Sequence, residues 1–82
     1  MKINRNIAIS ESGSLFNPIT GDFFTLNPVG VEIFHLIKEE NSTLEIMKKV
    51  LTKYDIDQHS FERDYFEFTG FLRKYNLIES EN

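Results

Sequence analysis

Residues 26–34 read LNPVGVEIF, and they connect the apolar end of a predicted strand directly to the start of a predicted helix. Asn27 is a favoured capping residue, because its side-chain oxygen can accept a hydrogen bond from the first helical turn. Pro28 suits the first helical position, since it has no N–H to leave unpaired and its φ is already fixed. Gly30 is costly inside a helix, so we expect close packing against it. The segment therefore predicts a helix that begins at Pro28.

Three short strands are predicted upstream of this helix. Ile7, Ile9 and Leu15 flank the turn-forming segment SESGS at residues 10–14. A second turn is predicted for NPITG at residues 17–21, because its Pro sets φ and its Gly accepts the positive φ of a tight reversal. We expect these segments and the run that follows them to form a small antiparallel sheet.

The run DFFTL, residues 22–26, is the third predicted strand. Side chains alternate along a strand, so Phe24 and Leu26 share one face while Phe23 and Thr25 share the other. The run contains neither Lys nor Pro, which commonly protect an exposed strand edge. Two alternatives follow: the edge is open and can pair with an added strand, or the chain's own helix covers it.

Two further helices are predicted after the first, which runs from Pro28 to about Lys38. The second opens at Ser42, because Ser42 and Glu45 match a capping box. Its apolar residues recur at helical spacing and comprise Leu44, Met47, Val50, Leu51 and Tyr54.

The third helix is predicted to begin near Asp57 or Ser60 and to carry more apolar surface than one core face needs. Phe71 and Tyr75 flank its inward stripe, near Asp64. The inward stripe recurs in steps of four, three and four residues, and comprises Phe61, Tyr65, Phe68 and Leu72. Phe66 lies well round the helix on the other side. These aromatics predict either a peptide groove, or packing of Phe71 or Phe66 beneath the N-terminal strands or in a dimer interface.

The chain after the third helix is predicted to turn back. Asn76 can adopt the left-handed conformation that ends a helix, and Leu77 and Ile78 then return to the core. Residues 79–82 are expected to fray. Together these predicted strands and helices indicate one domain, residues 1–82, of the α+β class. It consists of a three-stranded antiparallel sheet followed by three helices and is similar to a winged helix-turn-helix.

Composition argues against catalysis, metal binding and nucleic-acid binding. The 82 residues include no Cys, and the two histidines, His35 and His59, lack metal-ligand spacing. His35 lies among apolar helix residues, so we expect it at the core boundary. The sequence has no Gly-x-Ser-x-Gly motif and no Gly-rich phosphate loop. The net charge of −4 disfavours nucleic acid. We therefore expect a protein without catalytic residues, metal or cofactor.

The sequence also lacks membrane signals. No apolar run approaches the roughly 20 residues of a spanning helix, and the N-terminus lacks the apolar core of a signal peptide. We expect a cytoplasmic protein with no membrane partner.

The order and spacing of several short blocks resemble the PqqD-like family, whose members are also called RiPP recognition elements. The resemblance covers about residues 7–78. It rests on Ser10-Glu11, Leu15-Phe16-Asn17-Pro18, Thr20-Gly21, Leu26-Asn27, Gly30, Ile33, Leu36, Tyr54-Asp55-Ile56-Asp57, Asp64, Phe68, Leu72 and Leu77-Ile78.

This resemblance implies a non-catalytic peptide chaperone with a winged-helix-like fold. Such a domain accepts the leader of a ribosomally made precursor peptide as an extra antiparallel strand, beside its third strand and third helix. It then presents the precursor to a modifying enzyme, often a radical-SAM protein. With the aromatic pattern above, the resemblance predicts these peptide-binding residues: Asp22, Phe23, Phe24, Thr25, Leu26, Asp64, Phe68, Phe71 and Tyr75.

Two other function classes remain open at the level of sequence. A winged-helix DNA-binding regulator would place the third helix in the major groove, but its outward residues are of mixed charge: Glu62, Arg63, Glu67, Arg73 and Lys74. A protein–protein scaffold, or a homodimer, would instead pair through the exposed strand edge.

Overall fold

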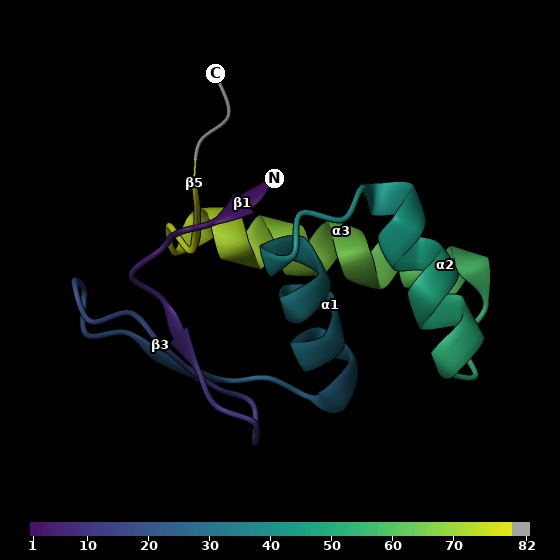
Figure 1. The fold of residues 1–82 in the computed structure, drawn as a ribbon. Coiled ribbons are helices and arrows are strands. Elements are labelled where there is room, and N and C mark those ends of the chain that lie inside the picture. Colours follow the sequence, from purple (N-terminus) through teal and green to yellow (C-terminus); the bar gives the residue numbers. More distant parts are fainter. Residues whose placement is uncertain (80–82) are drawn as a thin grey trace.

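The computed structural model describes residues 1–79, which form three helices and two small antiparallel sheets (Figure 1). The described elements follow the chain in the order β1 (Lys2–Ile3), β2 (Ala8–Ile9), β3 (Ser14–Phe16), β4 (Phe23–Thr25), α1 (Pro28–Lys38), α2 (Thr43–Lys53), α3 (Gln58–Lys74) and β5 (Ile78–Glu79). The predicted α+β class, with a three-stranded antiparallel sheet followed by three helices, is confirmed.

Strands β2, β3 and β4 form one antiparallel sheet in that order, so β4 lies at an edge. Each connecting turn contains a glycine at positive φ, Gly13 at 94° and Gly21 at 82°, where other residues are strained. Asn17 is buried in the second turn, and its side-chain oxygen accepts from Ile19 N at 3.0 Å. The two turns therefore fix how the strands follow one another.

A second sheet, absent from the sequence-based prediction, pairs β1 with β5. Lys2 lies opposite Glu79, and Ile3 lies opposite Ile78. Strands of two residues carry too little periodicity to be recognised, and this pair joins segments far apart in the chain. Glu79, which was expected to fray, lies in β5, so that expectation was wrong for this residue. Residues 80–82 lie outside the described residues.

The helices begin at their predicted caps. Asn27 Oδ1 accepts from Gly30 N at 2.8 Å, and Pro28 occupies the first helical position. At the start of α2, Ser42 Oγ accepts from Glu45 N at 3.1 Å and Ser42 N donates to Glu45 Oε1 at 2.8 Å. The backbone N–H and hydroxyl of Ser42 hold the pKa of Glu45 below its ordinary value.

Asp57 caps α3 in the same way. The Ser60 hydroxyl donates to Asp57 Oδ1 at 2.6 Å, and Ser60 N donates to Oδ2 at 3.3 Å. These bonds, the hydroxyl bond foremost, lower the pKa of Asp57. At the other end Asn76 has φ 58°, as predicted, and Leu77 is completely buried.

One hydrophobic core joins the sheet to the helices, and one burial prediction at its border, that of His35, was wrong. Leu44 is 55% exposed, whereas Ile46 is buried, because the inward stripe of α2 runs through Ile46 and Val50. His35 is exposed, since the helical rotation turns it away from its buried neighbours. The core comprises Ile7, Leu15, Ile33, Phe34, Leu36, Ile37, Ile46, Val50, Phe61, Leu72 and Leu77.

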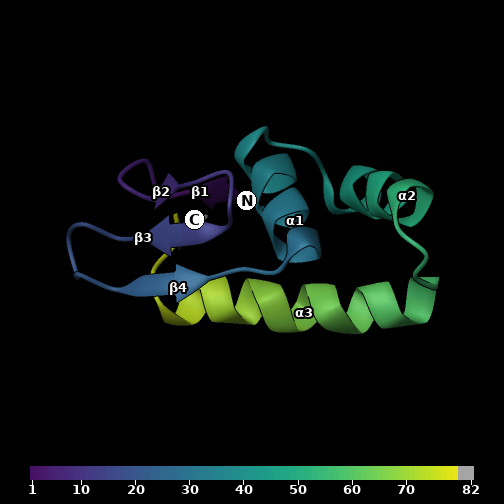
Figure 2. The ribbon, with the colours of Figure 1, turned by 90° about the horizontal axis from the view of Figure 1, so that it is seen from below.

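The 17-residue helix α3 is the longest element of the described residues. In Figure 2, β4 lies along its C-terminal half, whereas α2 lies near its N-terminal half. Its two ends therefore face two different environments, a strand at one end and a helix at the other.

Candidate functional site

Strand β4 uses one of its edges to pair with β3. Leu26 N donates to Gly13 O at 2.8 Å, and Asn17 N donates to Asp22 O at 2.9 Å. Along an antiparallel ladder, hydrogen-bonded pairs alternate with pairs that are not bonded to each other. Phe24 lies midway between these two positions, so it also directs its N–H and C=O groups toward β3.

The opposite edge of β4 is free. By the same alternation, Phe23 and Thr25 direct their N–H and C=O groups away from β3. Within residues 1–79, no hydrogen bond from another part of the chain reaches the outward N–H and C=O groups of Phe23 and Thr25. The structure thus has the open edge, the first of the two predicted alternatives. Such a row of backbone groups can accept an additional strand.

Four aromatic side chains join β4 to the C-terminal half of α3. Phe24 packs edge-on against Phe71 with ring centroids 4.9 Å apart, and its ring lies 4.8 Å from Tyr75. Phe71 in turn lies 5.4 Å from Tyr75 and 6.1 Å from Phe68. Tilted and edge-on ring pairs of this kind are favourable. The cluster therefore holds α3 beside β4 and places apolar surface next to the free edge.

A cavity of about 510 Å³ lies between β4, α3 and the start of α1, and we call it the edge groove. Its walls are mostly apolar side chains, while the strand adds unpaired backbone groups. That combination suits an extended peptide with apolar side chains. The lining residues are Phe23, Phe24, Thr25, Leu26, Asn27, Gly30, Phe68 and Phe71.

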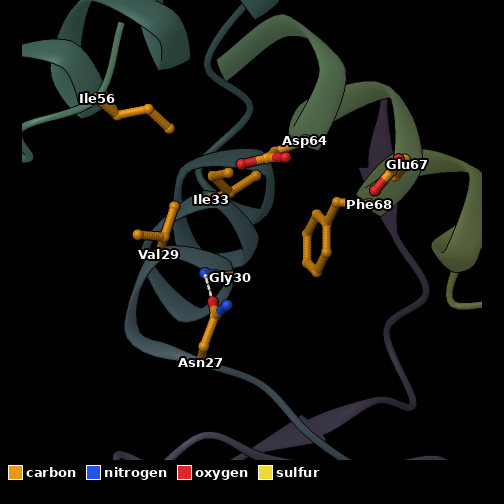
Figure 3. A pocket seen from close by; sticks show the side chains of 8 residues that line it. All are labelled: Asn27, Val29, Gly30, Ile33, Ile56, Asp64, Glu67 and Phe68. Atoms are coloured by element: carbon orange, nitrogen blue, oxygen red, sulfur yellow. Dashed lines mark hydrogen bonds between the residues drawn. The ribbon is translucent and has the colours of Figure 1, made fainter. Parts of the chain in front are cut away.

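A second cavity of about 420 Å³ adjoins the edge groove, and we call it the α1–α3 pocket (Figure 3). The two cavities share Asn27, Gly30 and Phe68, so they meet where the Phe68 ring approaches the first turn of α1. The complete lining consists of Asn27, Val29, Gly30, Ile33, Ile56, Asp64, Glu67 and Phe68.

Gly30 keeps the junction of these two cavities open. It is buried, and a Cβ atom there would lie 3.2 Å from Asn27 Oδ1 and 3.7 Å from Phe68 Cε1. A longer side chain would extend into the space that both cavities share. The predicted close packing against Gly30 is therefore confirmed, and its partners are the helix cap and α3.

One wall of the α1–α3 pocket is acidic. Asp64 and Glu67 lie one turn apart on α3, opposite the apolar side chains of Val29 and Ile33. Arg63 Nε lies 3.4 Å from Asp64 Oδ1, and the two side chains are 62% and 46% exposed. Ion pairs this exposed contribute little. The pocket therefore combines apolar surface with two carboxylates.

The predicted site residues fall into three groups. Asp64 lines the α1–α3 pocket. Tyr75 packs against Phe24, and Asp22 belongs to the hairpin turn, where its Oδ2 accepts from Thr20 Oγ1 at 2.8 Å. The other six line the edge groove: Phe23, Phe24, Thr25, Leu26, Phe68 and Phe71.

Six groove or pocket residues were missed, including Val29 and Ile33 of α1, and they differ in how far the sequence pointed to them. Asn27 and Gly30 follow β4 directly, so the first turn of α1 has to border the edge groove; the costly Gly30 was an available signal. Ile56 and Glu67 reach the α1–α3 pocket only through the packing of α3 against α1, and no local pattern marks them.

A third cavity of about 470 Å³ lies on the other side of α3, against α2, and we call it the far-side cavity. Phe66 is 78% exposed there. Its lining residues are Thr43, Leu44, Met47, Phe61, Glu62, Tyr65, Phe66, Thr69 and Arg73. Residues 1–79 contain no helix that is long and apolar enough to cross a bilayer. Within the same residues, no group of three or more His, Cys, Asp or Glu could hold a metal ion.

Comparisons with known proteins agree with this architecture. No protein with a curated description matches the sequence. TbiB1, solved in complex with the TbiA(beta) leader peptide, is 28% identical, with a TM-score of 0.87 over 100% of this chain and 99% of TbiB1. A lasso peptide synthetase B1, solved with a leader peptide, is 18% identical and shares the fold, with a TM-score of 0.79 over 98% of this chain and 96% of its own. The family model of coenzyme PQQ synthesis protein D (PqqD) matches residues 13–78, so the chain belongs to the PqqD family.

Proposed function

We propose that this chain binds the leader segment of a ribosomally made precursor peptide as an added strand on the free edge of β4. The observation that carries the proposal is this edge, because its unpaired backbone groups lie directly beside the apolar edge groove. The similarity to TbiB1, which was solved with a leader peptide bound, supports the same role for this chain.

Affinity and specificity would come from different groups. Phe23 and Thr25 would supply the backbone donors and acceptors, each hydrogen bond contributing about 0.5–1.5 kcal/mol net. Alternate side chains of an added strand point to the same face, so the residue opposite Phe24 enters the edge groove against Phe68 and Phe71. Leader residues at alternate positions, apolar and inward-facing, would then determine which peptide binds.

We propose an antiparallel orientation for the leader. β4 runs toward the start of α1, so an antiparallel leader runs away from it. Residues that precede the paired segment would therefore pass Gly30 and Phe68 and reach the α1–α3 pocket with its carboxylates, Asp64 and Glu67. The two cavities thus follow the leader in sequence order.

In this proposal the chain, as one domain of residues 1–82 in the cytoplasm, binds without catalysing a reaction. A separate modifying enzyme, such as a radical-SAM protein, would act on the bound precursor. The DNA-binding alternative has less support, because the net charge is −4 and the outward face of α3 mixes acidic with basic residues. The scaffold or homodimer alternative uses the same free edge, so the test below includes it.

The test is isothermal titration of the full chain with the leaders of short precursor peptides encoded beside its gene, and with the TbiA(beta) leader as a second probe. We expect at least one leader to bind in the micromolar range or tighter. Thr25→Pro removes an outward N–H from the free edge and adds a ring there, so binding should weaken by at least about 20-fold. Thr25→Val keeps the outward N–H and the β-branched shape, so its binding should weaken far less than that of Thr25→Pro.

Light scattering during the same titration separates a leader complex from a self-associated dimer. A single chain that takes up one leader supports the proposal. A stable dimer that no leader disrupts would contradict it, as would a Thr25→Pro variant that is folded and binds normally.

A further inference from the structure

The outer face of the sheet, which points away from α3, carries one apolar row that ends at the free edge. Ala8, Phe16 and Phe23 lie opposite one another across the three strands. Phe16 is 39% exposed and Phe23 is 62% exposed. We call these three residues the outer row. Natural edges usually carry charge or cover, so an exposed aromatic at this position calls for an explanation.

The neighbouring row on the same face is polar. Ser14 lies opposite Thr25, and Thr25 is exposed. The free edge therefore presents an aromatic position at Phe23 and a polar position at Thr25, both pointing outward. Phe24, between them, points inward to the edge groove.

An added strand would extend both rows by one residue each. Residues opposite Phe23 and Thr25 form the hydrogen-bonded pairs, and their side chains join the outer face. The residue opposite Phe24 faces inward; we call it the central leader position. In an antiparallel leader the next residue lies opposite Phe23, and the preceding residue lies opposite Thr25.

We propose that the chain recognises its leader on both faces of β4, and that Phe23 with Phe16 selects an apolar or aromatic residue immediately after the central leader position. This inference rests on the proposed function and deepens it. The residue before the central position is correspondingly polar or β-branched, because it continues the Ser14–Thr25 row. Covering the exposed Phe23 ring removes apolar surface from water, which favours an apolar partner there.

Because the outer row is apolar and the Ser14–Thr25 row is polar, the leader residues that bind beside them would indicate the direction of the leader. In an antiparallel complex the outward apolar residue follows the central position. In a parallel complex it would precede that position, because the same two rows would be read in the opposite order.

The experiment uses the leader that binds in the titration described above, displayed as a library with the central position and its two neighbours randomised. The original chain should enrich apolar residues at the central and next positions, and polar or β-branched residues at the preceding position. Phe23→Ala should lose the enrichment at the next position only. It should also weaken binding of the selected leader about three- to ten-fold.

Phe66→Ala is the matched control, because Phe66 is an exposed aromatic on the far side of α3, 78% exposed against 62% for Phe23. It should leave both enrichment and affinity unchanged. Phe16→Ala should reduce the enrichment less than Phe23→Ala, since Phe16 lies one strand farther from the leader. If Phe23→Ala fails to fold, replacing the outward leader residue with Ser should weaken binding to the original chain by the same factor.

The outcomes separate this inference from the proposed function. Enrichment at the central position alone, or equal effects of Phe23→Ala and Phe66→Ala, would overturn recognition on the outer face and leave strand addition intact. A leader preference in which the outward apolar residue precedes the central one would overturn the antiparallel direction. A chain that binds no leader would overturn the proposed function and this inference with it.

Discussion

The two sides of α3 offer cavities of similar size but of different chemical capacity. The edge groove measures about 510 Å³ and the far-side cavity about 470 Å³, and aromatic side chains line both. The edge groove is bordered by a strand whose outer backbone groups are unpaired. The far-side cavity is bordered by two helices, whose backbone groups bond within each helix.

Because of this difference, only the edge groove can hold an extended peptide in a defined register. Apolar surface attracts apolar ligands without direction, because the hydrophobic effect is non-directional. Backbone groups at strand spacing impose both a direction and a register on an extended chain. Cavity volume therefore does not identify the candidate site in this protein; the strand edge does.

Gly13→Ala should have the largest effect. It disturbs the pairing of β3 with β4, and β4 borders the edge groove but not the far-side cavity. A Cβ atom at Gly13 would lie 2.6 Å from Leu26 O, and its φ of 94° is unfavourable for alanine. We expect the free energy of unfolding to fall by about 2–3 kcal/mol. Chemical denaturation measures the loss, and hydrogen exchange should locate the new opening at β3 and β4. Equal loosening of α2 would contradict this account.

Gly30→Leu tests whether the edge groove, as distinct from the strand edge, contributes to leader binding. The new side chain would fill the space shared by the edge groove and the α1–α3 pocket, so leader affinity should fall about ten-fold. Gly70→Leu is the control, because nothing lies within 4 Å of a Cβ atom at Gly70. Titration of both variants should show the loss only at Gly30. An unchanged affinity would mean that the leader does not pass Gly30.

Gly70→Ala should stabilise the fold and leave the two sides of α3 as they are. Gly70 lies in the interior of α3 and nothing lies within 4 Å of an added Cβ atom, so alanine restores helix propensity without a clash. The free energy of unfolding should rise by about 0.5–1 kcal/mol. Gly30→Ala should gain less, because its Cβ atom would crowd Asn27 Oδ1 at 3.2 Å. Equal gains at both positions would show that the cap accommodates the methyl group.

Lowering the pH should give the smallest effect on stability. It should act first at the N-terminal caps of α2 and α3. Hydrogen bonds from Ser60 and Ser42 hold the pKa values of Asp57 and Glu45 below their ordinary values. Their contribution is therefore complete above about pH 4.5 and is lost as the pH falls through the lowered pKa values. Thermal unfolding followed from pH 7 to pH 2 should show this decline. Asp57→Asn, which still caps but does not titrate, should reduce the slope; an unchanged slope would exclude Asp57 as a cause.

The local elements of this fold could be predicted because each has a local cause. Asn27 and Pro28 mark the start of α1, and Ser42 with Glu45 marks the start of α2. The β1–β5 sheet had no such cause, since its strands are two residues long and lie at opposite ends of the described chain. Leu44 belongs to the apolar set at helical spacing and is nevertheless exposed, because spacing alone does not say which neighbours a stripe meets.

In the candidate site, too, only the features with a local cause could be predicted. Phe23 and Thr25 could be assigned to one face of the third strand from alternation alone. Their free backbone groups could not, because these depend on β3 occupying the other edge in a particular register. Glu67 and Ile56 entered the site only when α3 packed against α1.

By itself the sequence determined the strand-to-helix junction, the caps, the turns and the alternation along β4, because φ preferences and capping bonds act within a few residues. Only the tertiary structure decided that β4 keeps one edge unpaired and that Phe68 and Phe71 lie beside it. Those features depend on contacts between segments distant in sequence, whose relative positions are fixed by the packing of the common core.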